Sequence, residues 1–371
     1  MILVLYLHEH GEISGGETSL LVLWEHLDRR RFQPLLLGPP SGRFIERARR
    51  LGVPTHPAQF PRFRDLLTSR GRRCLASIER TVHQIKPSIL HSNTPHTNLA
   101  AAWIGRRSGC RVIWHERTLP HGDWDVDRRL RFLPDRIICN SVAVAQRFGG
   151  PNDRVVVIHN GVSLKEFIPG CGGHAVRQVL GLGPEQVSIG IVGNFGLVKR
   201  HELFLEAAEI LARDVRDARF LMIGDEVFPE NHGREASLRA ETNRLGLQGR
   251  VIFLGARADM PAVMDSLDIL VSACEVEACS RAIIEAMACG TPIVAADAGG
   301  NPELVAACRT GLLFPPGNAQ ALASALRTLI GDPSLRKAMG STARARAEER
   351  FSIQRHVQEI EAVYEDVVRT S

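Results

Sequence analysis

The sequence alternates short apolar runs with segments of helix length, and no other feature restricts its fold as strongly. In the first half, the apolar runs are Ile2–Leu7, Gln33–Leu37, Ile89–His91, Val112–His115, Arg136–Cys139 and Val155–Ile158. A second series comprises Ser188–Val192, Arg219–Ile223, Val251–Leu254, Ile269–Val271 and Thr291–Ala295. Strands that alternate with helices form parallel, doubly wound sheets. The sequence therefore predicts the α/β class, with two Rossmann-like domains in succession.

The boundary between the two series is marked by segment 167–173, which contains one proline and three glycines. Because these residues follow neither the helix period nor the strand period, we expect a hinge there. A chain of 371 residues is long enough for two ordinary cores. We predict domains over residues 1–168 and 169–352, followed by a closing amphipathic helix at about 353–371.

Several protein classes are excluded or disfavoured by composition. The apolar stretch Met1–Leu7 is too short for a secretory leader, and no window approaches the roughly 18 apolar residues of a membrane-spanning helix. The eight cysteines form no C-x-x-C pair, so reduced, buried thiols are expected in place of a metal site. We expect a cytoplasmic protein with no bound metal and no nucleic-acid partner.

Charge is distributed unevenly along the chain. Residues 1–170 carry 25 Lys and Arg against 15 Asp and Glu, a net charge of +10, whereas the remainder carries 21 against 26, a net charge of −5. The basic clusters are Arg29 to Arg31, Arg47 to Arg50, Arg62 to Arg64 and Arg70 to Arg73. Such a field attracts an anionic partner, either a membrane surface or a phosphorylated acceptor. A basic face that is merely solvated has the same composition.

Glycine-rich loops follow two of the expected strands, where ligands of open parallel sheets bind. Gly15 and Gly16 come after the first strand and allow the backbone to approach a phosphate or a sugar. Gly193 and Asn194 begin a second loop that ends with Lys199 and Arg200. A lysine in that position can neutralise a diphosphate. Surface residues of the same type would give an identical pattern.

The stretch 272–295 combines an expected helix with acidic residues in the loop before it. Ser280 is a typical N-cap and Gly290 a typical C-terminal stop. Glu277 and Glu285 can accept hydrogen bonds from sugar hydroxyls, and the free N–H groups at the helix start suit a phosphate. A fourth loop, Gly299-Gly300-Asn301, either extends this surface or forms a structural turn.

Taken in order along the chain, these motifs resemble the family-four retaining glycosyltransferases of the GT-B fold, also called glycosyl transferases group 1. The matching segments are Gly15-Gly16-Glu17, Val157–Val162, Gly193 with Lys199, Phe253-Leu254-Gly255, Glu277 and Glu285 with Ala286–Pro292, Gly299–Glu303 and Arg350-Phe351-Ser352. The matches span nearly the whole chain. Seven matches in order are far more specific than any one of them.

The resemblance implies two Rossmann-like domains facing across a cleft, an acceptor-side domain over residues 1–168 and a nucleotide-sugar-binding domain over residues 169–352. The closing helix would pack back on the first domain. The implied activity is retaining transfer of a hexose-type sugar from a nucleoside-diphosphate sugar to a glycan or lipid-linked acceptor. Cell-envelope polysaccharide or glycolipid synthesis is the implied context, and no cofactor or metal is implied.

Site residues follow from the same resemblance, position by position. Lys199 would hold the donor diphosphate, Glu285 the ribose hydroxyls and Glu277 the donor sugar, while His115 would lie beside the transferred sugar. The implied catalytic residues are thus His115, Lys199 and Glu277. The implied donor-binding residues are Gly15, Gly16, Asn194, Lys199, Arg200, Cys279, Ser280, Arg281 and Glu285.

The chain departs from the family pattern at two loops. Asn194 replaces the usual arginine and Arg200 the usual glycine, so we expect Arg200 to supply the missing charge. Ala278-Cys279-Ser280 replaces the usual Gly-Phe-Gly. The small side chains still permit close approach of the backbone to a ligand, but the donor preference is left open.

Three alternative functions are compatible with parts of the sequence. A nucleotide-sugar epimerase of the GT-B fold and a non-catalytic nucleotide-sugar-binding protein would keep the same donor residues. An NAD-dependent oxidoreductase is disfavoured because neither half contains G-x-G-x-x-G with an acidic residue about twenty positions later.

Two further segments of the basic half invite an interpretation. The acidic pattern Asp123-Trp124-Asp125-Val126-Asp127 is either a solvated loop or, less favoured, a cation site. The segment from Arg62 to Arg73, together with Phe60, Phe63, Leu66 and Leu67, is a candidate for contact with a membrane surface. We therefore expect a peripheral association with the inner face of the membrane.

Overall fold

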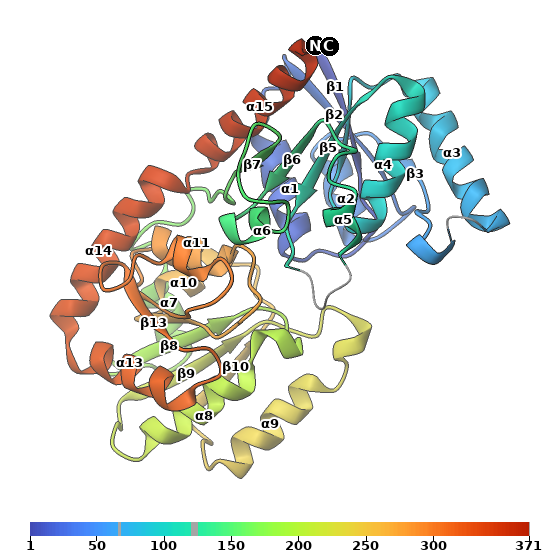
Figure 1. Ribbon diagram of the computed structural model, residues 1–371. Coiled ribbons are helices and arrows are strands. Elements are labelled where there is room, and N and C mark those ends of the chain that lie inside the picture. The colour runs from blue at the N-terminus through green and yellow to red at the C-terminus, as the bar shows by residue number, and fades with distance from the viewer. Residues whose placement is uncertain (66–67, 120–124, 371) are drawn as a thin grey trace. The chain divides into compact units, whose positions relative to one another are not determined.

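The protein consists of two compact α/β units (Figure 1). The computed structural model describes residues 1–65, 68–119 and 125–370, without the side chain of Phe63. The first unit comprises Met1–Asn160 and Ile353–Ser371, and the second comprises Gly161–Ser352. The division therefore falls upstream of the expected residue 168, and segment 167–173 belongs to the second unit.

The first unit is built on a seven-stranded parallel sheet with the strand order β3-β2-β1-β4-β5-β6-β7. Its strands are β1 (Ile2–Leu7), β2 (Phe32–Gly38), β3 (Thr55–Pro57), β4 (Ile89–Ser92), β5 (Arg111–Glu116), β6 (Arg136–Cys139) and β7 (Val155–Val157). The strand β1 pairs with β2 on one side and β4 on the other, so the order of the strands reverses at β1. Ligands of such sheets bind beyond the carboxyl ends of the strands at this switch point.

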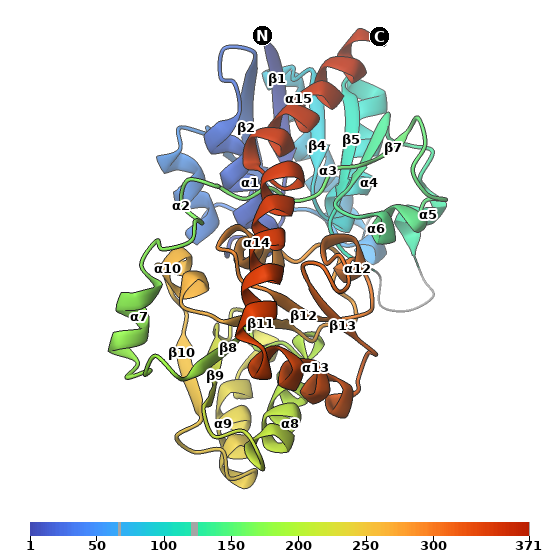
Figure 2. The ribbon, with the colours of Figure 1, turned by 90° about the vertical axis from the view of Figure 1, so that its left-hand side faces the viewer.

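Helices surround the sheet of the first unit. They are α1 (Gly15–His26), α2 (Arg43–Arg50), α3 (Ser69–Ile85), α4 (Pro95–Ser108), α5 (Val126–Arg129), α6 (Val142–Gln146) and α15 (Ile353–Arg369), with a 3₁₀ turn at Phe63–Asp65. The closing helix α15 lies along α1 (Figure 2). Its residues Val357, Ile360, Tyr364 and Val367 are buried because their spacing of three and four places them on one face. The helix expected from the sequence is confirmed.

The second unit contains a six-stranded parallel sheet with the order β10-β9-β8-β11-β12-β13. Its strands are β8 (Val187–Val192), β9 (Ala218–Ile223), β10 (Val251–Gly255), β11 (Ile269–Ser272), β12 (Ile293–Ala296) and β13 (Gly311–Phe314). The order reverses at β8, which pairs with β9 and β11. The switch point of this sheet therefore lies between β8 and β11.

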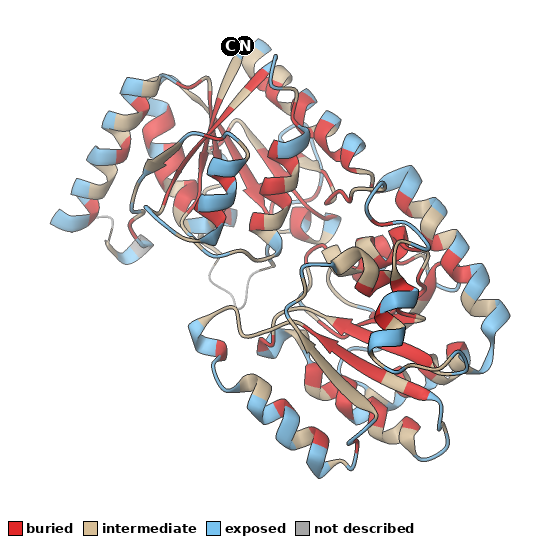
Figure 3. Cartoon of the chain, turned by 180° about the vertical axis from the view of Figure 1, so that it is seen from behind, coloured by how far each residue is buried: buried red, intermediate tan, exposed pale blue. Residues whose placement is uncertain are grey.

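Helices cover this second sheet as well. They are α7 (Gly173–Val179), α8 (His201–Ala212), α9 (Arg234–Arg244), α10 (Met260–Asp265), α11 (Arg281–Ala288), α12 (Asn301–Leu304), α13 (Ala319–Gly331) and α14 (Pro333–Arg350), with 3₁₀ turns at Leu197–Lys199 and Pro229–Asn231. In both units the sheets are mostly buried and the helices expose their outer faces (Figure 3). Among the described residues, no helix has the length and apolar character required to cross a membrane.

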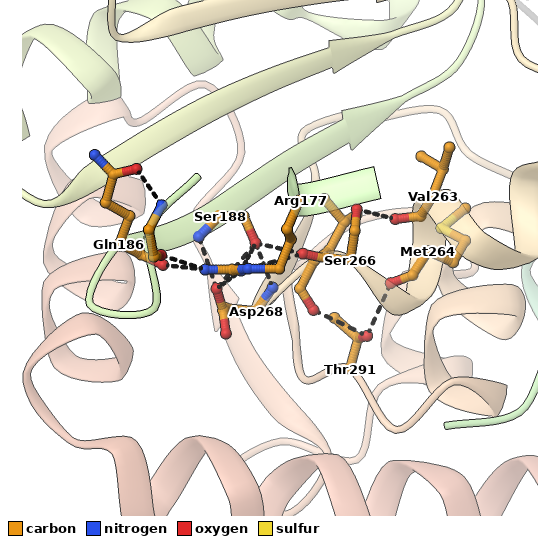
Figure 4. Close-up of polar contacts among 10 residues, drawn as sticks. Arg177, Gln186, Ser188, Val263, Met264, Ser266, Asp268 and Thr291 are labelled. Atoms are coloured by element: carbon orange, nitrogen blue, oxygen red, sulfur yellow. Dashed lines mark hydrogen bonds and ion pairs between the residues drawn. The ribbon is translucent and has the colours of Figure 1, made fainter. Parts of the chain in front are cut away.

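A polar cluster joins the beginnings of β8 and β11 (Figure 4). One carboxylate oxygen of Asp268 accepts hydrogen bonds from the Ser188 N–H at 2.8 Å and from Arg177 Nη1 at 2.8 Å. Arg177 Nη2 also donates to the carbonyls of Gly183 at 3.1 Å and Gln186 at 2.6 Å. These charge-assisted hydrogen bonds fix α7 and both strands in one register, which in turn positions the loops at the strands' other ends.

The segment expected to be a hinge is bound to its own unit. The Asp265 carboxylate accepts hydrogen bonds from the N–H groups of Gly170, Gly172 and Gly173 at 2.7, 3.1 and 2.6 Å. A Cβ on Gly173 would lie 2.4 Å from the Asp265 carbonyl oxygen, so a side chain there is excluded. The glycines therefore serve a close backbone packing against α10.

Candidate functional site

Two charged residues meet at the switch point of the second sheet. Lys199 ends the 3₁₀ turn that follows β8, and Glu277 lies in the loop that follows β11. Lys199 Nζ lies 2.6 Å from Glu277 Oε2, and the two side chains are 26% and 14% exposed. The parallel strands β8 and β11 are neighbours, so the loops at their carboxyl ends meet although the two residues are 78 positions apart.

The Lys199 ammonium stays charged in this position. Burial by itself lowers the pKa of Lys199, but the charge of Glu277, the nearby Cys274 and the hydrogen bond to Glu277 together outweigh this effect, and the pKa lies above its ordinary value. The pair borders a small cavity of about 10 Å³, whose other polar lining comes from Ser272, Cys274 and Ser280. A cavity of that size holds at most about one water molecule. A diphosphate is too large for this cavity and would reach the Lys199 ammonium from the exposed side of its side chain.

The loop that carries Glu277 is shaped by the glycines of the fourth loop. The Gly300 N–H donates to the Glu277 carbonyl oxygen at 2.7 Å. Gly299 has a φ of +57°, and a Cβ on it would lie 2.3 Å from that same oxygen. Asn301 Nδ2 donates to the carbonyls of Cys274 and Ala296 at 3.2 and 3.1 Å. Of the two interpretations offered above, the structural turn explains these glycines.

The helix α11 begins and ends as its sequence predicts. The Ser280 side chain accepts a hydrogen bond from the Ile283 N–H, and Gly290 adopts a φ of +76° just beyond the helix. On its first turns, Arg281 Nη2 lies 2.9 Å from Glu285 Oε1. Burial raises the pKa of Glu285, and the positive charge of Arg281 offsets part of this rise. Cys279, directly before the cap, is buried in the apolar core of the unit.

Two of the residues at which the chain departs from the family pattern, Asn194 and Arg200, are both committed to local contacts. Arg200 adopts a φ of +58°, the left-handed region in which glycine is the usual residue. Its side chain is 48% exposed, and its Nε lies 3.2 Å from Glu275 Oε1. Asn194 Oδ1 accepts a hydrogen bond from the Gly196 N–H at 3.1 Å. Arg200 thus retains a charge close to the Lys199 loop, whereas Asn194 stabilises the loop itself.

In the first unit, Gly15 and Gly16 form the start of α1. Among the described residues, a Cβ on Gly15 would have no neighbour within 4 Å, and one on Gly16 would meet only Arg117 Cδ, at 3.9 Å. Neither glycine has a positive φ. The folded chain therefore does not require glycine at these positions.

Glu17, next to these glycines, has its carboxylate fully used within the unit. It accepts a hydrogen bond from the Ser14 N–H at 2.9 Å and lies 2.7 Å from His8 Nε2. Although burial opposes ionisation, the hydrogen bond and charge of His8, with the bond from Ser14, lower the pKa of Glu17 to about 2. Within the motif Gly15-Gly16-Glu17, the two glycines thus begin the helix α1 with few neighbours, and Glu17 holds this end of the helix through its contacts with Ser14 and His8.

His115 lies near the carboxyl end of β5 and is only 1% exposed. Its Nδ1 lies 3.1 Å from His91 Nε2 and 3.1 Å from Arg117 Nη2. Burial lowers the pKa of His115 well below its ordinary value, and the positive charge of Arg117 lowers it further. The imidazole is therefore neutral at physiological pH.

The acidic pattern of the first unit is a buried ionic cluster, so the expectation of a solvated loop is wrong for its second half. Arg147 Nε lies 2.8 Å from Asp125 Oδ2, and Arg147 Nη1 lies 2.8 Å from Glu116 Oε2. Burial and the neighbouring Glu116 charge raise the pKa of Asp127 to about 8. Asp123 and Trp124 lie outside the described residues. Within the described ranges, no group of three or more His, Cys, Asp or Glu side chains is arranged to hold a metal ion.

The first unit also contains a pocket of about 340 Å³. It lies beyond the carboxyl ends of β2 and β3, against the middle of α3. Its lining residues are Pro40, Pro57, Ala58, Gln59, Arg73, Cys74, Ser77, Ile78 and Thr81. A single cation, Arg73, thus borders a mainly apolar and hydroxyl-bearing surface, which suits an amphipathic or phosphorylated ligand.

The sequence patterns did not reveal the partners of these residues. His91 and Arg117 around His115, Arg147 among its acids and Glu275 beside Arg200 are residues that only the structure brings into the site. The one available signal was the position of His91 at the end of a predicted strand next to that of His115. Neighbouring parallel strands place their last residues side by side.

Two family models match the chain. "Glycosyltransferase Family 4" matches residues 13–166, and "Glycosyl transferases group 1" matches residues 174–346. The two matches fall in the first and the second unit, apart from residues 161–166, and together leave only the ends and a short junction uncovered.

Individual proteins are similar over nearly the full length. The lipopolysaccharide core biosynthesis mannosyltransferase LpsB of Rhizobium meliloti is 26% identical over 85% of this chain and 88% of its own. The UDP-Gal:alpha-D-GlcNAc-diphosphoundecaprenol alpha-1,3-galactosyltransferase of Escherichia coli is 24% identical over 96% of this chain and 95% of its own.

The crystal structure of Anabaena Alr3699/HepE in complex with UDP and glucose superimposes with a TM-score of 0.85. It is 26% identical in sequence and covers 98% of this chain and 99% of that one. With two Rossmann-like units, both family models and relatives that are themselves glycosyltransferases, the chain belongs to the group 1 glycosyltransferases of the GT-B fold.

Proposed function

We propose that the protein transfers a hexose from a uridine-diphosphate sugar to a glycan or lipid-linked acceptor of the cell envelope, with retention of configuration at the anomeric carbon. The observation that carries this proposal is the contact between Lys199 and Glu277 at the switch point of the second sheet. It offers one cation for a diphosphate and one carboxylate for sugar hydroxyls within a single small site.

The chemistry follows from where charge develops. As the bond between the sugar and the diphosphate loosens, negative charge accumulates on the leaving phosphate. Lys199 and Arg200, with the free N–H groups at the start of α11, would stabilise this charge, and each well-placed donor can contribute several kcal/mol to the transition state. The leaving oxygen would take the acceptor's proton, so no side-chain base is needed.

The remaining site residues would orient the donor. Glu285 would accept hydrogen bonds from the ribose hydroxyls, and the backbone at Gly15 and Gly16 would approach the phosphates from the first unit. His115 would contact the transferred sugar. Because the side chains of Lys199 and Arg200 supply the positive charge, we propose that the reaction needs no metal ion.

Uridine and a hexose are proposed because of the similar proteins. Alr3699/HepE was crystallised with UDP and glucose, and the similar E. coli enzyme is described as using UDP-Gal. The name of the R. meliloti relative specifies mannose, so the identity of the hexose varies among relatives. GDP- and ADP-sugars are therefore included in the transfer assay and in the thermal unfolding experiment.

The acceptor would bind to the first unit. Its pocket bordered by Arg73 lies beyond two strand ends, and Arg62, Arg64, Arg70 and Arg72 are exposed nearby in sequence. This combination favours a phosphorylated or lipid-linked acceptor at the cytoplasmic face of a membrane. Leu66 and Leu67, which were also assigned to this surface, lie outside the described residues.

A transfer assay tests the proposal. The purified protein is incubated with UDP-, GDP- and ADP-hexoses, with and without a diphosphoundecaprenol-linked sugar or a lipopolysaccharide core oligosaccharide, and the products are analysed by mass spectrometry and NMR. Transfer of one hexose with the donor's anomeric configuration supports it. Conversion of donor to an isomer without acceptor would indicate an epimerase, and donor binding without turnover on any acceptor would indicate a binding protein.

Membrane association has its own test. The protein is floated with vesicles of phosphatidylglycerol and phosphatidylcholine at low and at high salt, beside a variant with Arg70, Arg72 and Arg73 changed to Gln. Binding to the anionic vesicles that weakens with salt and in the variant is expected. Absence of binding at low salt would rule out the membrane surface as a partner.

A further inference from the structure

A chain of buried polar side chains runs through the core of the first unit and ends at His115. Tyr6 Oη lies 2.8 Å from Tyr364 Oη, and Tyr364 Oη lies 2.7 Å from His91 Nδ1. His91 Nε2 lies 3.1 Å from His115 Nδ1. The four residues come from β1, α15, β4 and β5, and each is 0 to 1% exposed. Water therefore plays little part in setting their protonation.

The direction of every hydrogen bond in this chain follows from Arg117. Its Nη2 lies 3.1 Å from His115 Nδ1, and a guanidinium only donates. His115 Nδ1 must therefore accept, which leaves the proton of the neutral ring on Nε2. Since the same Nδ1 is 3.1 Å from His91 Nε2, that nitrogen must be the donor.

The same reasoning extends to the two tyrosines. With its proton on Nε2, His91 accepts at Nδ1, so the Tyr364 hydroxyl donates to it. The Tyr364 oxygen then accepts from the Tyr6 hydroxyl. In this arrangement both tyrosine hydroxyls and both nitrogens of His91 have a partner, and Arg117 Nη2 and His91 Nε2 share the Nδ1 lone pair of His115. Every proton of the chain then points toward His115.

We propose that Arg117, His91 and Tyr364 are positioning residues that hold His115 as the neutral Nε2–H tautomer, so that His115 acts as a hydrogen-bond donor and not as a base. Among the described residues, the buried His115 Nε2 has no hydrogen-bond partner. A buried donor without a partner is unfavourable in the free protein and is satisfied by an oxygen that a ligand brings. That this oxygen belongs to the donor sugar rests on the proposed function.

Electrostatics act in the same direction as geometry. Burial lowers the pKa of His91 well below its ordinary value, and Arg117 lowers it further. The groups that affect His115 are Arg117, His91 and His356, and all three disfavour a second proton on its ring. Both imidazoles are therefore neutral over the physiological range, and the hydrogen bonds alone select the tautomer.

Nitrogen NMR of the full chain labelled with ¹⁵N-histidine tests the tautomers directly. Spectra of His115→Gln and His91→Gln assign the two rings. Both are expected to show a protonated Nε2 and an unprotonated Nδ1, unchanged between pH 6 and pH 8. A protonated Nδ1 on His115, or a charged ring in this range, would overturn the proposal whatever reaction the protein catalyses.

Point variants test which residues impose the tautomer. Arg117→Met is expected to give His115 a mixture of tautomers, and Tyr364→Phe is expected to do so for His91. Tyr6→Phe is the matched control, because it removes a hydroxyl from the same buried chain but leaves the donor to His91 in place. An unchanged spectrum in both Arg117→Met and Tyr364→Phe would show that these residues do not position the rings.

Activity separates this inference from the proposed function. His115→Gln keeps an N–H donor and is expected to retain kcat/KM within about threefold, whereas His115→Phe is expected to lower it about tenfold, the value of one hydrogen bond. If the tautomer is Nε2–H but both variants bind and use the donor like the wild type, then the positioning stands and the role of His115 in donor binding is wrong.

Discussion

Removal of the Glu277 charge is predicted to tighten the binding of UDP. In the free protein, the Lys199 ammonium forms an ion pair with the Glu277 carboxylate, 2.6 Å away. A diphosphate must compete with that carboxylate for the ammonium and is also repelled by it. Two unit charges at about 4 Å interact by about 4 kcal/mol at an effective dielectric constant of 20. Solvent and salt reduce this figure, because both side chains are partly exposed.

We take about 1.4 kcal/mol as the remaining effect, which corresponds to about a tenfold lower Kd for UDP in Glu277→Gln. Lys199→Met is predicted to raise the Kd by about 30-fold, since it removes a cation from a charge pair with the ligand, at a cost of about 2 kcal/mol. The sugar-free nucleotide is used because Glu277 should also contact the donor sugar, and the two effects would otherwise oppose each other.

Isothermal titration of UDP into the wild type, both single variants and the double variant measures the coupling. If Glu277 acts through Lys199, the tightening disappears in the Lys199→Met background and diminishes at high salt. Glu241→Gln is the matched control, because it removes the same charge from an exposed pair with Arg244. Weaker binding of UDP to Glu277→Gln, or a gain that persists without Lys199, would refute this reasoning.

Three further predictions concern stability and affinity. Arg177→Met should lower the free energy of unfolding by about 3 kcal/mol in urea titrations, against less than about 1 kcal/mol for the exposed Arg327→Met, and equal losses would contradict the account of the polar cluster. Arg200→Ala should weaken UDP binding about threefold in the same titrations if its charge reaches the diphosphate, and an unchanged Kd would exclude that role. Burial lowers the pKa of His201 from 6.5 to about 4, so protonation of this residue should reduce the free energy of unfolding as the pH drops from 6.5 to 4. Burial raises the pKa of Asp127 from 3.8 to about 8, so ionisation of this residue should reduce the free energy of unfolding as the pH rises from 4 to 8. Urea titrations across this range should show the acidic loss reduced in His201→Asn and the alkaline loss reduced in Asp127→Asn, and unaltered pH profiles would contradict these assignments.

The central strands of both sheets could be predicted because they are buried on both faces and appear as continuous apolar runs. The strands β3 and β13 were missed. Both are edge strands, of three and four residues, and the segment Thr55–Pro57 ends with a proline, which lacks the N–H group of a sheet donor. Neither segment carries enough periodic signal to be separated from a loop.

The site divides in the same way. Lys199 and Glu277 could be assigned to one place because their strands follow a parallel, doubly wound order. The ion pair between Arg147 and Asp125, and the contact of Tyr364 with a histidine 273 positions away, could not be predicted. These contacts depend on how side chains of segments far apart in the sequence pack together, and the sequence contains no repeating pattern that links such segments.

The central claim, a nucleoside-diphosphate sugar bound without metal at Lys199, is tested most directly by thermal unfolding. The protein is heated with UDP, GDP, ADP, NAD and the corresponding sugar conjugates, with and without EDTA, beside Lys199→Met. A ligand that binds only the folded state at one hundred times its Kd stabilises it by about 2.7 kcal/mol. The account predicts stabilisation by UDP and UDP-hexoses that EDTA leaves unchanged and Lys199→Met abolishes. Stabilisation by NAD alone, or by a nucleotide only when metal is present, would contradict it.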